Sequence, residues 1–131
     1  MNASNLQDLG KLILRITLGV LILLHGIFKL RNGIGAIEGM VTSHGLPAFV
    51  AYGVLVGEVL APVLLLLGFF SRIGAALIAV NMLFAFALAH MSMLGQLNEQ
   101  GGWALELQGM YLAAAVALAL LGPGRYAINQ R

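Results

Sequence analysis

Four long apolar stretches, separated by short polar segments, organise the sequence. They cover residues 11–30, 46–70, 73–94 and 103–121. Each stretch is close to or above the roughly 20 residues with which an α-helix crosses about 30 Å of hydrocarbon. The pattern therefore predicts an all-α integral membrane protein, a four-transmembrane-helix bundle that forms one membrane domain over residues 1–131.

Composition strengthens this prediction. Apolar residues make up 60% of the chain and charged residues 9%, whereas soluble domains have about 45–50% and about 25%. The few charges are scattered, so we expect the lipid bilayer, not nucleic acid, as the surrounding partner. The chain has no cysteine, which excludes a disulfide, a thiolate nucleophile and cysteine-ligated zinc or iron–sulfur centres. Lys29 and Arg31 directly follow the first apolar stretch without a small-residue cleavage site, so we expect that stretch to be retained.

The distribution of basic residues predicts the orientation. The N-terminus, the short turn after the second stretch and the C-terminus share one side of the membrane. Five basic residues lie on that side and two on the other, which predicts that both termini are cytoplasmic. The five are Lys11, Arg15, Arg72, Arg125 and Arg131, and the two are Lys29 and Arg31.

An ionisable side chain within a span marks the first candidate site. Glu58 lies about 14 Å below the outer boundary, and its insertion costs at least ~2.5 kcal/mol at a helix centre. His25 lies about 9 Å below the same boundary, and Lys29 follows one turn further out on the same helix face. We predict a polar cluster of these three residues, in which an opposite charge offsets desolvation of the carboxylate. Glycines on this face of the first helix, Gly19 and Gly26, indicate that it points into the bundle.

Pro62 adds a backbone feature at the same place. A helix proline cannot donate to the carbonyl four residues earlier, which belongs to Glu58. The resulting kink could form an acceptor-rich site for a cation, a proton or a polar headgroup. Alternatively, a neighbouring polar side chain such as Asn81 on the third helix donates a hydrogen bond to the backbone oxygen that the kink leaves without a partner.

His90 and Glu106 lie near the outer ends of the third and fourth helices. Each half of the chain has a helix with an outer histidine followed by a helix with a glutamate. This pattern suggests a weak parallel two-helix repeat about an axis normal to the membrane. Such a repeat would bring His25, Glu58, His90 and Glu106 to one outward-opening cavity.

The histidines and glutamates at these positions raise two cofactor chemistries, a haem and a metal site. His25 and His90 differ by roughly 6 Å in their depth in the membrane, so a haem bound by both histidines is conceivable. The favoured interpretation is that both are hydrogen-bonded side chains inside the helix bundle. No Glu-x-x-His pair marks a dimetal centre, so no metal site is predicted. The sequence also lacks phosphate-binding glycine loops and nucleophile elbows.

Several short motifs follow one another in a set order along the chain. They are Arg15 with Gly19, residues 25–30 (His-Gly-Ile-Phe-Lys-Leu), Gly57 with Glu58, residues 66–68, Ser71 with Arg72, Ala85, His90, Glu106 and residues 121–126 (Leu-Gly-Pro-Gly-Arg-Tyr). Together these motifs resemble the DoxX family of small bacterial membrane proteins. Asn129 departs from the family pattern, which often has an aspartate at this position.

The resemblance implies an inner-membrane protein with four helices. Some members are similar to subunits of a thiosulfate:quinone oxidoreductase, and others look like partners of redox-stress enzymes. It thus implies a quinone-linked or redox-complex subunit and, if the protein is an enzyme, part of a membrane oxidoreductase instead of a stand-alone catalyst. The cofactor stays open, with quinone as a candidate. The positions carried over are His25, Lys29, Glu58, His90 and Glu106.

Two other functions remain open at this point. The chain could be a non-enzymatic scaffold that recruits partner helices through small residues such as Gly109 and Ala113. It could also be a small transporter or proton path, which would require a homo-oligomer because four short helices scarcely enclose one.

Overall fold

The computed structural model describes residues 2–87 and 95–130. These residues are helical apart from connections and one isolated bridge between Leu97 and Trp103. The elements are α1 (Ala3–Asn32), α2 (Gly35–Ser43), α3 (Val50–Leu55), the π-helical turn η1 (Val56–Leu60), α4 (Ala61–Leu67), α5 (Ser71–Ala85) and α6 (Glu106–Leu121).

Within residues 2–87 and 95–130, two helices are long and apolar enough to cross a membrane. These are α1 and the continuous segment Val50–Leu67, which comprises α3, η1 and α4. The other apolar helices, α5 and α6, have 15 and 16 residues within the described parts of the chain. The predicted helical membrane architecture is therefore supported, whereas four complete crossings and their direction stay predictions.

Several helix boundaries differ from the apolar windows. The fourth window starts at Trp103, but α6 starts at Glu106, because Trp103 is paired with Leu97 across a polar turn. The connection between the first two windows contains α2, which the sequence did not predict. Its glycine content is typical of a loop, but the segment forms a helix whose Val41 is fully buried.

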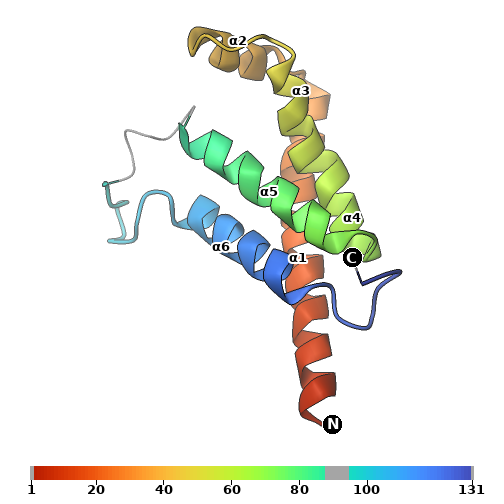
Figure 1. Cartoon of the computed structure of the whole chain (residues 1–131). Coiled ribbons are helices and arrows are strands. Elements are labelled where there is room, and N and C mark those ends of the chain that lie inside the picture. The colour runs from red at the N-terminus through yellow and green to blue at the C-terminus, as the bar shows by residue number, and fades with distance from the viewer. Residues whose placement is uncertain (1, 88–94, 131) are drawn as a thin grey trace.

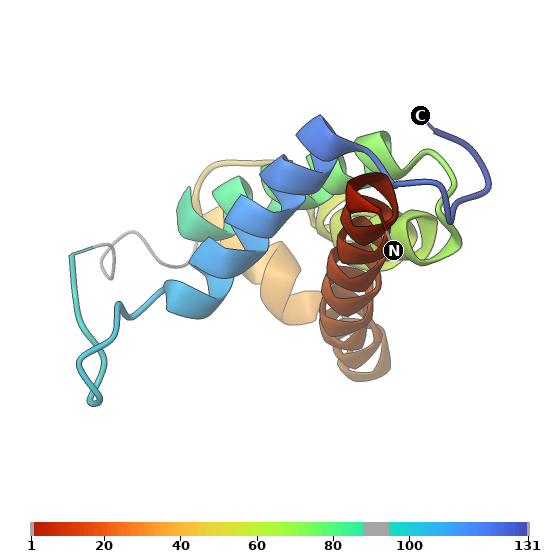
Figure 2. The same cartoon turned by 90° about the horizontal axis from the view of Figure 1, so that it is seen from below.

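Helices α1, α4, α5 and α6 build the core. Helix α4 contacts α1 on one side and α6 contacts it on another, while α5 and α6 lie side by side (Figures 1 and 2). Leu18 and Ile22 of α1 pack there with residues of α4, α5 and α6. The inward orientation predicted for the face with Gly19 and Gly26 is confirmed, since both glycines are buried.

The C-terminal segment folds back against the turn between α4 and α5. Arg15 is only 2% exposed and donates to the backbone oxygens of Pro123 and Tyr126, at 3.3 and 2.7 Å. The Asn129 side-chain oxygen accepts from the backbone N–H of Phe70 at 2.9 Å, just before α5 begins. A buried cation and a side-chain cap thus fix the end of the chain to the bundle.

Candidate functional site

Glu58 is carried by the π-helical turn in the middle of the second long segment. In η1 the N–H of Ala61 bonds to the oxygen of Val56, five residues earlier, and Pro62 follows directly. Because Pro62 cannot donate, the regular bonding of an α-helix is interrupted here. Such π-turns occur frequently at functional sites. The turn directs the Glu58 side chain into the protein, where the residue is 5% exposed.

Two residues from neighbouring helices bind the Glu58 carboxylate. The ammonium nitrogen of Lys29 lies 2.6 Å from each carboxylate oxygen. Asn81, from α5, donates its side-chain N–H to Oε1 at 3.2 Å. The site therefore joins α1, η1 and α5 through a charge pair and an amide, so its geometry depends on tertiary packing.

Two glycines allow these elements to approach closely. A Cβ atom at Gly26 would overlap the backbone carbonyl oxygen of Glu58 and lie 2.7 Å from its carbonyl carbon. A Cβ at Gly57 would lie 2.6 Å from Cβ of Asn81. Any larger residue would move α1 or α5 away from η1. Because Gly26 and Gly57 have no side chain, α1 and α5 can bring Lys29 and Asn81 close to the carboxylate.

A cavity of about 140 Å³ adjoins the charge pair. It lies among α1, η1, α5 and α6. Its lining residues are Ile22, His25, Lys29, Glu58, Met82, Ala85, Leu107, Gln108 and Tyr111.

His25 and Tyr111 give this cavity a further polar pair. The Nδ1 atom of His25 lies 2.9 Å from the backbone oxygen of Leu21, which can only accept a hydrogen bond. Nδ1 therefore carries the proton, and Nε2 of the neutral ring is an acceptor. The Tyr111 ring meets the imidazole edge to face, with 5.8 Å between ring centroids. The cavity can thus offer an ammonium, a phenol, an imidazole and a carboxylate to one ligand.

Comparison with known proteins identifies the family. The family profile described as DoxX matches residues 10–91, well over half of the chain and including the Lys29, Glu58 and Asn81 positions. The chain belongs to the DoxX family. It is also 29% identical over 106 residues to "Putative oxidoreductase CatD" of Bacillus subtilis (strain 168), which covers 81% of this chain and 78% of the relative. No solved structure matches the chain.

The remaining predicted site residues of this DoxX protein lie elsewhere. Glu106 does not line the cavity. Its Oε1 instead accepts from the Asn98 side chain of the preceding loop at 3.2 Å. His90 lies outside the described residues, so the convergence of two histidines and two glutamates, the repeat and the haem pairing stay predictions. Across residues 2–87 and 95–130, no three His, Cys, Asp or Glu residues gather as metal ligands.

Sequence reasoning missed Gln108 and Tyr111 as cavity residues of the DoxX protein. Their signal was present, since the two polar side chains lie three residues apart and share a face of the fourth apolar stretch. Glu106, the charged residue of that helix, lies on a different face.

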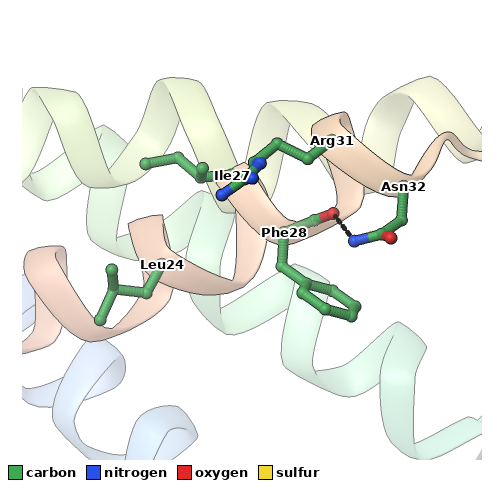
Figure 3. Close-up of a pocket in the computed structure, with 5 residues that line it drawn as sticks. All are labelled: Leu24, Ile27, Phe28, Arg31 and Asn32. Atoms are coloured by element: carbon green, nitrogen blue, oxygen red, sulfur yellow. Dashed lines mark hydrogen bonds between the residues drawn. The ribbon is translucent and has the colours of Figure 1, made fainter.

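A larger surface hollow of about 490 Å³ has a different character. Its lining comes from one helix, α1, and Figure 3 shows Leu24, Ile27, Phe28, Arg31 and Asn32 along it. The Asn32 side chain donates to the Phe28 oxygen at 2.8 Å. Three of the five lining residues are exposed and apolar, and none is an acid or a histidine. The smaller cavity beside Glu58 is therefore the stronger candidate site.

Proposed function

We propose that this DoxX protein is a membrane subunit of an oxidoreductase complex and binds a quinone headgroup in the cavity beside Glu58. The supporting observation is the ion pair between the half-buried Lys29 and the buried Glu58, which lines a ring-sized cavity together with His25 and Tyr111. The relative named as an oxidoreductase supports the same functional class.

The size and polarity of the cavity suit such a headgroup. A protein cavity of about 150 Å³ accommodates a benzene ring, and the cavity here has about 140 Å³. The Lys29 ammonium and the Tyr111 hydroxyl are donors for carbonyl oxygens. The His25 Nε2 atom and the Glu58 carboxylate are acceptors for the hydroxyl groups of the reduced form. The apolar tail would extend from the cavity between the helices into lipid.

The proposed role of the chain is to exchange protons at this headgroup. A quinone takes up two electrons and two protons to become a hydroquinone. A partner oxidoreductase subunit would supply or receive the electrons. His25 would carry one proton on Nε2, and Glu58 would carry the other when Lys29 moves away from it. Both groups lie on the cavity wall, as general acid–base transfer requires.

Quinone retention tests this proposal. The protein is purified in mild detergent, bound quinones are quantified by mass spectrometry, and a short-tailed quinone is titrated into lipid-free protein. We expect binding by the natural sequence and loss of binding in the double variant Lys29→Met with Glu58→Gln. The double variant removes both charges, so it avoids the unpaired buried charge that a single substitution leaves. Arg31→Gln, at the end of the same helix, is the matched control. Natural protein without retained quinone and without measurable affinity would refute the proposal.

A scaffold function is the second candidate, and the outer face of α6 favours it. Leu107, Met110 and Leu120 are 50%, 66% and 75% exposed. If this face recruits a partner helix, the Lys29 and Glu58 double variant would retain its membrane partners. A bulky residue at the exposed Ala113 would instead release them. Gly109, in contrast, is covered by the Trp103 ring of the same chain.

A further inference from the structure

The N-terminal part of α1 extends beyond the other helices. Helix α6 packs against α1 but ends at Leu121, whereas α1 continues to Ala3, and Figure 1 shows its N-terminal end projecting from the bundle. Gln7, Gly10, Lys11 and Leu14 recur at helical spacing on one face of this extension. The same face contacts the core further along the helix, and beyond the end of α6 the chain at Gly124 lies beside Lys11, where an added Cβ would come within 3.3 Å of the Lys11 Cβ.

This face forms one side of a hollow of about 430 Å³. The lining residues are Gln7, Gly10, Lys11 and Leu14 of α1 together with Leu121 at the end of α6. Gly10 contributes open space, because a Cβ atom there would meet nothing within 4 Å. Leu14 and Leu121 make the bundle-side end apolar, while Gln7 and Lys11 make the other end polar. Two helices therefore enclose an amphipathic groove.

The charge of this groove is not balanced by the protein. Lys11 is half-buried and has no hydrogen bond or carboxylate partner in the part of the chain that the structure describes. The nearby acid, Asp8, has its carboxylate 3.9 Å from Nε of Arg125. Arg72 adds a positive charge at the same end of α6, where it donates to the oxygens of Ala119 and Leu120. The local excess is therefore positive.

We propose that this groove binds an anionic phospholipid, with its phosphate at Lys11 and Gln7 and an acyl chain along Leu14 and Leu121. Lys11 begins the first apolar stretch, so it lies at the depth where headgroups meet hydrocarbon. Basic pockets between membrane helices recognise acidic lipid headgroups through this combination of charge and apolar wall. The inference is independent of the quinone proposal, because it concerns the opposite end of α1.

Lipid retention measured by native mass spectrometry tests the groove. The detergent-solubilised protein is offered phosphatidylglycerol and, separately, zwitterionic phosphatidylcholine. We expect preferential retention of phosphatidylglycerol, a fall of about fivefold in Lys11→Gln, and retention in Lys11→Arg. Gly10→Phe fills the hollow without changing the charge and is expected to reduce retention too. Arg31→Gln removes a cation at the other end of α1 and should leave retention unchanged.

Several outcomes would overturn the inference. The first is equal retention of both lipids by the natural protein. The second is an equal fall in Lys11→Gln and Arg31→Gln, which would show unspecific attraction to charge. The third is unchanged retention in Gly10→Phe, since a lipid seated in the hollow must be displaced by the ring. Displacement of phosphatidylglycerol by inorganic phosphate alone would also refute the acyl-chain contact.

Discussion

Replacing Gly26 with alanine tests how closely α1 must approach the Glu58 turn. The added Cβ would overlap the Glu58 carbonyl oxygen, lie 2.7 Å from its carbonyl carbon and lie 2.8 Å from a Val59 methyl carbon. Ordinary contact begins at 3.4 Å, so the elements must separate by at least 0.7 Å (3.4 minus 2.7). The obstacle is backbone, which cannot rotate away as a flexible side chain can.

The expected cost follows from overpacking. Such an insertion destabilises a packed protein by about 1–3 kcal/mol, and a gap of 0.5–1 Å removes roughly a quarter to a half of each opposing contact energy. The higher helix propensity of alanine offsets about 1 kcal/mol or less of this destabilisation. We therefore expect a net loss of about 1–2 kcal/mol in the free energy of unfolding, together with weaker quinone retention at the neighbouring site.

The assay is unfolding in detergent micelles, followed by circular dichroism. Gly10→Ala is the matched control, because it makes the same change in the same helix where a Cβ meets nothing within 4 Å. It is expected to leave stability unchanged or raise it by about 0.5–1 kcal/mol. Equal stability of the Gly26→Ala and Gly10→Ala variants would refute the close approach of α1 to η1.

Three further predictions concern the charge pair, the chain end and the topology. Lys29→Met alone removes the cation beside the buried Glu58 carboxylate, and because Lys29 is itself 30% exposed we expect a loss of about 1–3 kcal/mol in thermal unfolding. Glu58→Gln added to it should recover most of this loss, because the unpaired carboxylate is then removed. No recovery would mean that Glu58 is not buried as described. Asn129→Ala should lower the free energy of unfolding by about 1 kcal/mol, because it removes the acceptor for the Phe70 N–H. Asn129→Asp should not lower it, since an aspartate oxygen can accept the same hydrogen bond, and an equal loss in both variants would contradict the contact. Because the chain has no cysteine, single cysteines at Ser4, Ser43 and Gln100 report topology through impermeant thiol reagents in intact cells. Four crossings with both termini cytoplasmic predict labelling at Ser43 and Gln100 but not at Ser4, and labelling at Ser4 would reverse the orientation.

Asn129 also illustrates what a family pattern leaves open. The aspartate common at this position and the asparagine found here share the one feature that the contact uses, a side-chain oxygen two bonds from Cβ. Its role became visible only because Phe70 lies 59 residues earlier in the chain and beside it in the fold. Arg15 is a second example. In the sequence it counts as one of the basic residues that predict the orientation, whereas in the structure its hydrogen bonds to Pro123 and Tyr126 hold the C-terminal segment.

The sequence by itself determined the helical class, the membrane character and the family, because these follow from the length and periodicity of apolar runs and from ordered local motifs. It also singled out Glu58, Lys29 and Asn81, since polar groups within apolar stretches are costly enough to be conspicuous. Only the tertiary structure decided which of them meet. Lys29 and Asn81 reach Glu58, while Glu106 binds Asn98 of its own preceding loop. These pairings depend on helix rotation, on the π-turn before Pro62 and on close approach at Gly26 and Gly57, and those are set by packing between segments far apart in the chain.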